Sequence, residues 1–198
     1  MSQPARRIAL FGGSFDPVHP AHLAIARAAV KQAGLDFVIF LPAAQSPLKD
    51  HGPEASGLLR GEMLHAALTD CPWAEVSDWE LHQPGPSYSW QTVEHFLRSA
   101  APDTTWFWLM GVDQWDQLPR WQRWELFAGL VVFLVFTRKG IVPQPRVGVR
   151  AVFLSGEFAG SSTQVRAARR EGRAWEALVD PAVAEIIRRE GLYAATMR

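Results

Sequence analysis

The segment I-A-L-F-G-G-S-F-D-P-V-H-P-A-H-L, residues 8–23, joins a short apolar run to two adjacent glycines and then to two histidines three residues apart. The run Ile8–Phe11 is typical of a strand that is buried on both faces of a parallel sheet. Gly12 and Gly13 follow at once, and without side chains their backbone can take positive φ and approach a ligand closely. A helix that begins near Pro20 would offer unpaired N–H groups to an anion, so the segment predicts a phosphate-binding strand, loop and helix start.

His19 and His22 stand at positions i and i+3, which lie on one face of the helix if it has begun by Pro20. Two imidazoles that donate toward phosphate oxygens can neutralise the charge that develops during phosphoryl or nucleotidyl transfer. Each piece alone has an ordinary explanation, such as a turn or a helix cap, but the ordered combination points to function. The glycine spacing differs from the dinucleotide fingerprint G-x-G-x-x-G, which makes a hydride-transfer dehydrogenase the weakest alternative.

Residues 12–22, G-G-S-F-D-P-V-H-P-A-H, resemble the signature of the nucleotidyltransferases with an H-x-G-H motif. The rest of the chain is most similar to the bacterial nicotinate-mononucleotide adenylyltransferases. The resemblance implies that ATP binds with Mg²⁺ and that the phosphate of nicotinate mononucleotide attacks its α-phosphorus, giving deamido-NAD and pyrophosphate. One departure is Ala21, which stands where the family has glycine. The residues that the resemblance makes catalytic are His19, His22, Lys49 and Arg166.

The predicted ATP side draws on both ends of the chain. Residues 160–166, G-S-S-T-Q-V-R, resemble the family's S-S-T-x-[IV]-R, and a helix start there has free N–H groups for triphosphate oxygens; the ordinary alternative is a capped basic helix. Lys49 follows the apolar run 37–41 in a pattern in which Leu48 replaces the family's histidine, and a loop lysine alone is more often solvated. The residues expected to bind ATP are Gly12, Gly13, Ser14, Phe15, His22, Ser162, Thr163 and Arg166.

Two other segments carry the predicted substrate side. Residues 86–92, P-S-Y-S-W-Q-T, resemble the family's S-Y-T-x-D-T, with Gln91 in place of its acidic residue. Residues 111–121 resemble G-x-D-x-x-x-x-L-x-x-W, whose tryptophan stacks on the pyridine ring in the family. Without the resemblance, Trp121 would be assigned to the core, and Asp113 could be a helix N-cap. Thr92 or Ser89 could cap the helix that follows Tyr88. The residues expected to bind the mononucleotide are Asp16, Tyr88, Thr92, Asp113, Trp121 and Arg138.

Composition narrows the class of protein. Hydrophobic residues make up 48% of the 198 residues and charged ones 20%, a globular balance, and no apolar run approaches the ~20 residues that span a bilayer. Basic and acidic residues number 20 each, so no overall field recruits nucleic acid. The single cysteine, Cys71, cannot form an internal disulfide, and the N-terminus lacks the apolar core of a signal peptide, so a cytoplasmic location is expected. No ligand cluster typical of a zinc site is present, and no metal-binding residue is predicted.

Strand and helix signals alternate along the whole chain. Apolar runs predict strands at 8–11, 37–41, 75–77, 105–110, 130–136 and 151–154, while helix patterns fill 21–33 and 57–69 and begin again near 92, 162 and 181. Gly34 is expected to end the first helix, and the C-terminal G-L-Y is expected to pack without a role in chemistry. We therefore predict one Rossmann-like α/β domain over residues 1–198, with a mainly parallel sheet and helices on both faces.

Several functions remain open at this level. Nicotinamide mononucleotide, a pantetheine phosphate or another phosphorylated acceptor could take the place of nicotinate mononucleotide, because the ATP motifs would be the same. A noncatalytic nucleotide-binding module is the alternative of a different class, and the departures at Ala21, Leu48 and Gln91 favour it. The sequence indicates no oligomeric state.

Overall fold

A six-stranded parallel sheet forms the centre of the molecule in the computed structural model, which describes residues 6–45, 47, 51–137 and 143–195. The strands lie in the order β3-β2-β1-β4-β5-β6, and every neighbouring pair is parallel. From β1 the chain adds β2 and β3 on one side of the sheet, and then β4, β5 and β6 on the other side. The strand order therefore reverses between β1 and β4. Ligands of open α/β sheets bind at such a switch point, beyond the carboxyl ends of the strands. The strands are β1 (Arg7–Gly13), β2 (Phe37–Pro42), β3 (Ala74–Val76), β4 (Thr105–Gly111), β5 (Val132–Phe136) and β6 (Ala151–Leu154).

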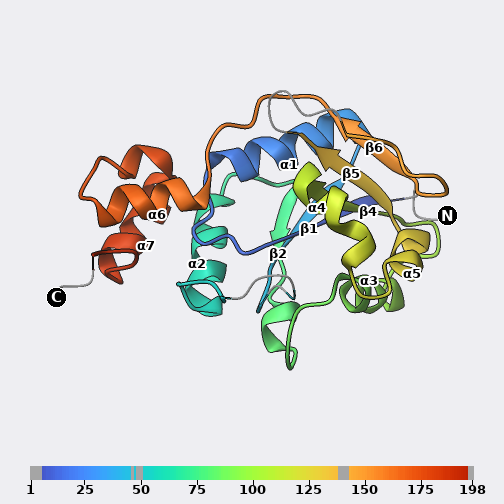
Figure 1. Ribbon diagram of the computed structural model, residues 1–198, viewed down its shortest axis with the longest axis horizontal. Helices are drawn as coiled ribbons and strands as arrows, with labels where there is room; N and C mark the ends of the chain where they lie inside the picture. The colour runs from blue at the N-terminus through green and yellow to red at the C-terminus, as the bar shows by residue number, and fades with distance from the viewer. Residues whose placement is uncertain (1–5, 46, 48–50, 138–142, 196–198) are drawn as a thin grey trace.

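Helices cover both faces of the sheet, as predicted (Figure 1). One face packs against α1 and α2, with α6 and α7 continuing the same core beyond α2; the other face packs against α3, α4 and α5. The helices are α1 (Pro20–Ala33), α2 (Gly57–Ala67), α3 (Ser89–Arg98), α4 (Val112–Gln117), α5 (Trp124–Leu130), α6 (Ser162–Arg170) and α7 (Pro181–Arg189), with short 3₁₀ turns at Trp79–His82, Leu118–Arg120 and Glu176–Leu178. The predicted Rossmann-like fold class is confirmed.

The strand β1 shows why the central runs are apolar without alternation. Ala9 and Phe11 belong to the core under α1, whereas Leu10 belongs to the core under α3 to α5. Successive side chains of a strand point to opposite faces, so a strand with helices on both sides needs an apolar residue at every position. β1 is therefore rigidly held up to Gly13, where the loop to α1 leaves the sheet.

The C-terminal helices lie at one end of the molecule beside α2 (Figure 1). Val165 of α6 and Ile187 of α7 are buried in the same core as Met63 of α2. Two predicted helix boundaries are confirmed. Gly34 ends α1 with φ 58°, and Pro181 is the first residue of α7. Residues late in the sequence are thus packed against the segment that follows β2.

The structure corrects two predicted boundaries. The strand predicted at 130–136 begins only at Val132, because Leu130 ends the helix α5. A continuous apolar run does not separate the end of a buried helix from the start of a buried strand. The helix that either Thr92 or Ser89 was expected to cap begins at Ser89, with Tyr88 in the capping position, so both residues lie inside the helix and neither caps it. Within the part of the chain that the structure describes, no helix is long and apolar enough to cross a membrane.

Candidate active site

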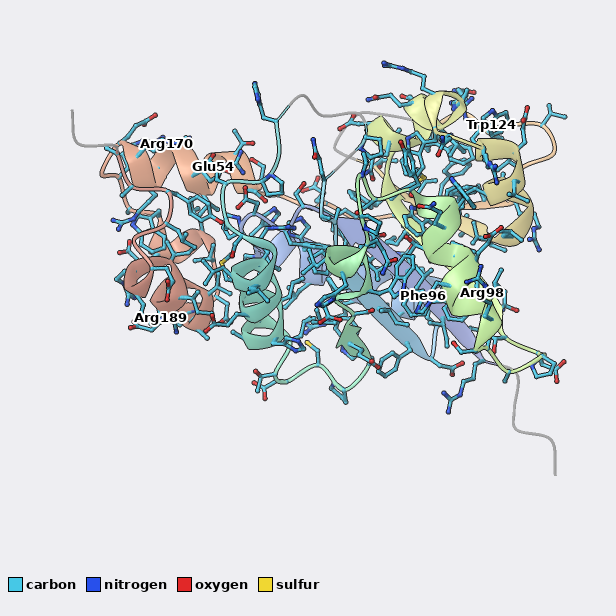
Figure 2. All side chains as sticks on the ribbon, turned by 90° about the horizontal axis from the view of Figure 1, so that it is seen from below. Glu54, Phe96, Arg98, Trp124, Arg170 and Arg189 are labelled. Atoms are coloured by element: carbon cyan, nitrogen blue, oxygen red, sulfur yellow. The ribbon has the colours of Figure 1, made fainter. Side chains whose placement is uncertain are left out.

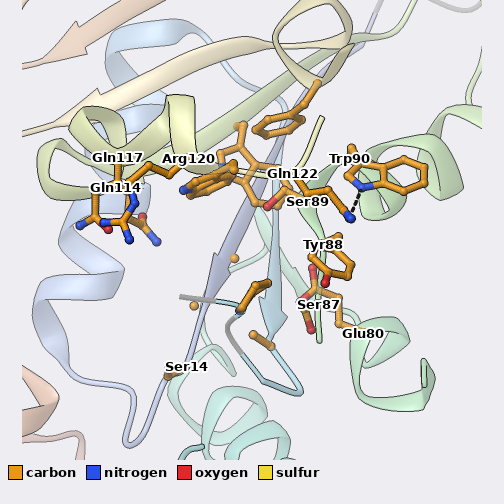
Figure 3. Close-up of a pocket in the computed structure, with 17 residues that line it drawn as sticks. Ser14, Glu80, Ser87, Tyr88, Ser89, Trp90, Gln114, Gln117, Arg120 and Gln122 are labelled. Carbon is orange, nitrogen blue, oxygen red and sulfur yellow. Dashed lines mark hydrogen bonds between the residues drawn. The ribbon is translucent and has the colours of Figure 1, made fainter. Parts of the chain in front are cut away.

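Two cavities lie beyond the carboxyl ends of the central strands and share Ser14. The first, here called the histidine cavity, has a volume of about 470 Å³ and is lined by Asp16, His19, His22, residues 51–54, Phe136, Phe158 and residues 160–163 with Arg166. The second, the aromatic cavity, measures about 450 Å³ (Figure 3). Its walls are Gly12, Gly13, Ala43, Pro47, Glu80, Ser87 to Trp90, Trp108, Gln114, Gln117, Arg120 to Gln122 and Phe127. Both volumes fall within the range of small-molecule sites.

The two glycines at the end of β1 do not have the positive φ that the sequence suggested. They remain in the extended strand, and it is Phe15 that takes a positive φ of 46°. A Cβ atom at Gly13 would lie 2.9 Å from the ring of Phe15, and one at Gly12 would lie 3.1 Å from the ring of Trp108. Glycine is therefore needed here for space between packed rings. Both glycines line the aromatic cavity, not the histidine cavity where ATP contacts were expected.

The rings of His19 and His22 lie side by side at the start of α1, with centroids 3.8 Å apart and planes tilted by 32°. The backbone N–H of His19 donates to Nδ1 of His22 at 3.2 Å, so in the neutral ring the hydrogen of His22 resides on Nε2. Phe15 packs edge-on against His22 at 4.9 Å, and Phe15 itself is buried and lines neither cavity. Burial, and then the nearby His19, lower the pKa of His22 well below its ordinary value. His22 is accordingly a neutral donor held in one orientation.

The carboxylate of Asp16 is occupied by the protein's own donors. Oδ2 accepts from the backbone N–H of Glu54 at 2.8 Å, and Oδ1 accepts from the N–H of Ala55 at 3.1 Å and from the hydroxyl of Tyr193 at 2.7 Å. Next to it, buried Arg60 donates to the carbonyl oxygens of Ser14, at 2.8 Å, and Ala55. Asp16, predicted to bind the mononucleotide, lines the histidine cavity instead and fixes the loop that borders it.

The start of α6 is anchored to the loop that carries the histidines. Ser161 caps the helix by accepting from the N–H of Gln164 at 3.2 Å, and the hydroxyl of Ser162 donates to the carbonyl of Pro17 at 2.9 Å. Arg166 donates from Nη1 to the carbonyl of Asp16 at 2.7 Å. The structure thus brings Ser162, Thr163 and Arg166 into one cavity with both histidines, although some 140 residues separate them in sequence.

Trp121 lies in a cluster of aromatic rings that walls the aromatic cavity. Its ring stacks on Phe127 at 5.8 Å with an interplanar angle of 13°, and Trp108 packs against it edge-on at 6.4 Å. Tyr88, the other aromatic residue that the sequence predicted here, lines the same cavity (Figure 3). These contacts hold the indole of Trp121 in a fixed plane, with part of the ring exposed.

Besides Asp16, two more residues predicted to bind the mononucleotide, Thr92 and Asp113, do not line the aromatic cavity. Thr92 is fully buried and donates to Oε1 of Glu80 at 2.7 Å. Asp113 is exposed on the first turn of α4, and it is Gln114 and Gln117 of that helix that line the cavity. Two further predicted residues, Lys49 and Arg138, lie outside the described residues.

Glu80 is a buried carboxyl group in the wall of the aromatic cavity. Burial raises its pKa, while hydrogen bonds from Thr92 and Ser87 act in the opposite direction. Ser87 in turn accepts from the backbone N–H of Ala44 at 3.0 Å. Glu80 therefore joins α3 to the segment after β2. Sequence reasoning missed it, because an isolated glutamate between loop residues carries no periodic signal of burial.

Other contributors were also missed from sequence. Trp90 donates from Nε1 to Oε1 of Gln122 at 3.3 Å (Figure 3). The guanidinium of Arg123 lies 4.4 Å from the Trp90 ring centroid. Glu54, which no motif included, and Tyr193, which was expected only to pack, both hydrogen-bond to Asp16 in the loop of the histidine cavity. Among the described residues, no group of three or more histidine, cysteine, aspartate or glutamate side chains is arranged to hold a metal ion.

Comparison with known proteins identifies the family of the chain. The model of the cytidylyltransferase-like family matches residues 10–168. The chain is 36% identical to a probable nicotinate-nucleotide adenylyltransferase of Synechococcus sp. (strain JA-3-3Ab), covering 95% of both chains, and 38% identical to that of Gloeobacter violaceus, covering 94% of this chain and 96% of the relative.

Solved structures show the same fold. A Plasmodium falciparum nicotinic acid mononucleotide adenylyltransferase complexed with NaAD superposes with a TM-score of 0.75 at 15% identity, over 95% of this chain and 97% of that one. A putative nicotinate-nucleotide adenylyltransferase from Vibrio parahaemolyticus gives 0.68 at 19% identity, over 96% and 97%. From the family match and the near full-length identities, the chain belongs to the cytidylyltransferase-like family and, within it, to the nicotinate-nucleotide adenylyltransferases.

Proposed function

We propose that the protein transfers the adenylyl group of ATP to nicotinate mononucleotide, forming deamido-NAD and pyrophosphate in NAD biosynthesis. The observation that carries the proposal is the pair of adjoining cavities. His19, His22 and the start of α6 line one, stacked aromatic rings line the other, and Ser14 belongs to both. A reaction between two nucleotides needs two such pockets, with the reacting phosphates meeting where they join.

The histidine cavity is suited to the triphosphate. Backbone N–H groups at the starts of α1 and α6 favour anions, and Arg166 adds a full positive charge. His22 donates from Nε2 to an oxygen of the α-phosphate, where negative charge develops as the acceptor attacks. Because its neighbour fixes the ring, this donor is in place before ATP arrives.

The aromatic cavity is suited to the pyridine nucleotide. The pyridine ring stacks on Trp121, whose plane is fixed by Phe127 and Trp108. Hydrogen-bond donors for the ring carboxylate come from the segment Ser87–Trp90, which lines the opposite wall. The ribose and phosphate then extend toward Ser14 and the histidines.

The chemical step needs no nucleophile from the protein. A phosphate oxygen of the mononucleotide, already an anion at neutral pH, attacks the α-phosphorus; the bond to the β-phosphate oxygen breaks and pyrophosphate leaves with that electron pair. Alignment and charge neutralisation are what the protein contributes.

We further propose that Mg²⁺ enters with ATP. The acidic residues lining the histidine cavity are Asp16 and Glu54, and hydrogen bonds and arginines already occupy both carboxylates. This donor set fits an ion carried on the triphosphate, which retains most of its own water. When bound, the ion offsets the charge of the leaving pyrophosphate. The buried free thiol of Cys71 fits a cytoplasmic setting for the reaction.

The test is an assay of pyrophosphate release with ATP, Mg²⁺ and one mononucleotide at a time. We expect product with nicotinate mononucleotide at a kcat/KM well above that for nicotinamide mononucleotide, and none with 4′-phosphopantetheine. A preference for nicotinamide mononucleotide would change the acceptor but keep the adenylyl transfer. ATP binding without pyrophosphate release from any acceptor would establish a noncatalytic nucleotide-binding protein and refute the proposal.

A further inference from the structure

Glu54 lies at the edge of the histidine cavity in a fixed position. Its backbone N–H donates to Oδ2 of Asp16 at 2.8 Å, and the next residue, Ala55, donates to Oδ1 of the same carboxylate at 3.1 Å. The side chain of Glu54 is about two-fifths exposed, at 41%, and lines the cavity together with the histidines. Its backbone is anchored by these two hydrogen bonds to Asp16, which leaves the carboxylate available to the cavity.

That carboxylate bridges two arginines of α6. Oε1 lies 2.9 Å from Nε of Arg166, and Oε2 contacts Nη2 of Arg170. The arginines are four residues apart, so they stand on one face of the helix, and Figure 2 shows Glu54 beside Arg170 at this end of the molecule. Each carboxylate oxygen therefore faces one guanidinium.

The two ion pairs differ in kind. Arg170 is about half exposed, at 46%, and does not line the cavity, whereas Arg166 is 21% exposed and lines it. Nε of Arg166 is buried without an aligned hydrogen-bond acceptor, so its contact with Glu54 is one of charge alone. Nη1 of the same guanidinium is fixed on the carbonyl of Asp16 at 2.7 Å. Arg166 is thus held in the cavity with a weakly satisfied positive charge.

A triphosphate that enters this cavity meets Arg166 already paired with the carboxylate of Glu54. Exposed ion pairs contribute little to stability, whereas a polyanion in a partly enclosed cavity repels a neighbouring carboxylate and attracts the arginine. When Glu54 releases Arg166 it keeps Arg170, so its charge is never left without a partner. When the triphosphate replaces Glu54 on Arg166, both the carboxylate and the guanidinium therefore still have a partner of opposite charge.

We propose that Glu54 is an internal counter-ion that pairs with Arg166 while the cavity is empty and competes with the triphosphate for it. The inference rests on the proposed function, in that ATP is the anion of the histidine cavity. Glu54 sets the affinity for ATP and takes no part in bond making. It keeps Arg166 oriented before the nucleotide binds, at the expense of some affinity for the triphosphate.

Calorimetric titration with ATP and Mg²⁺, in the absence of any acceptor, tests the proposal. Glu54→Gln keeps the backbone bond to Asp16 and removes the charge, and we expect its Kd for ATP to fall about two- to tenfold. Glu54→Ala should tighten ATP binding in the same direction. Glu62→Gln is the matched control: Glu62 pairs with Arg189, at 2.9 Å, and lines neither cavity, so its Kd should equal that of the unchanged protein.

The outcomes separate the two proposals. The KM for ATP should fall with Glu54→Gln while kcat does not rise, and the affinity for adenosine, which has no phosphate, should stay the same. Unchanged or weaker ATP binding by both Glu54 variants would overturn the counter-ion role alone. If the unchanged protein failed to bind ATP, the proposed function would be refuted and the counter-ion role with it.

Discussion

The hydroxyl of Tyr193 donates a 2.7 Å hydrogen bond to Oδ1 of Asp16, joining residues 177 positions apart in the chain. Asp16 belongs to the loop that carries the histidines, and Tyr193 follows the last helix, α7. Both residues are buried, and burial together with the hydrogen bond to Asp16 raises the pKa of the Tyr193 hydroxyl, so it remains a donor at all ordinary pH values. The C-terminal residues therefore hold the active-site loop, beyond the packing role that the sequence indicated.

Replacing Tyr193 with Phe should destabilise the protein by about 1–3 kcal/mol, because a hydrogen bond to a buried carboxylate is lost while the ring is kept. Urea denaturation monitored by circular dichroism measures the change. Ser99→Ala, which removes an exposed hydroxyl at the end of α3, should stay within about 0.5 kcal/mol. Equal stability of Tyr193→Phe and the unchanged protein would show that the bond contributes nothing.

Replacing His22 with Ala should lower kcat by about 100-fold or more, since a donor to the developing charge is removed. The KM values should change little, because the backbone N–H groups and Arg166 remain. Steady-state assays of pyrophosphate release give both constants. His65→Ala, at an exposed position of α2, is the control and should leave kcat unaltered. An equal kcat in the two variants would refute the role of His22.

Replacing Trp121 with Ala should weaken mononucleotide binding by about 1–3 kcal/mol, or roughly 5- to 150-fold, the scale of a lost stacking contact. The KM for ATP should not change, because Trp121 lines only the aromatic cavity. Trp124→Ala removes a partly buried indole three residues further on that lines neither cavity, and it should leave the mononucleotide KM as it was. A normal mononucleotide KM for Trp121→Ala would assign Trp121 to the core alone.

Glu80 should make stability depend on pH. Burial raises its folded-state pKa above the ordinary 4.5, so the folded protein binds more protons than the unfolded chain between these values. The contribution of Glu80 to the free energy of unfolding is fully present below pH 4.5 and is lost as the pH rises through the raised pKa of its carboxyl group. Glu80→Gln cannot ionise, so its stability relative to the unchanged protein should improve as the pH rises from 4.5 to 8. Urea midpoints across that range measure the difference, and parallel curves would contradict it.

Local signals predicted much of the fold. The uninterrupted apolar runs of β1, β2 and β4 identified central strands of a parallel sheet, because such strands are buried on both faces. Gly34 and Pro181 marked helix ends through their own backbone preferences. The strand predicted at 130–136 was two residues too long, because Leu130, which is equally apolar, is the last residue of the helix α5.

The candidate site was predictable only in part. The motif strings identified seven residues that do line the two cavities: His19, His22, Ser162, Thr163, Arg166, Tyr88 and Trp121. They also suggested Thr92 and Asp113, yet the first is buried against Glu80 and the second faces solvent. A motif records which residue types recur at a spacing, whereas the direction of each side chain depends on what packs beside it.

The sequence by itself determined the alternation of strands and helices, the ends of several helices and the residue types available for phosphate chemistry, since these depend on neighbours within one or two turns of chain. The tertiary structure decided which of them meet. Asp16 hydrogen-bonds to Glu54 and Tyr193, which are 38 and 177 residues away in the chain. The side chain of Glu54 pairs with Arg166, and Gly13 is required because the ring of Phe15 fills the adjacent space. Such contacts form only when the whole chain is packed, because each depends on the close fit of side chains from distant segments.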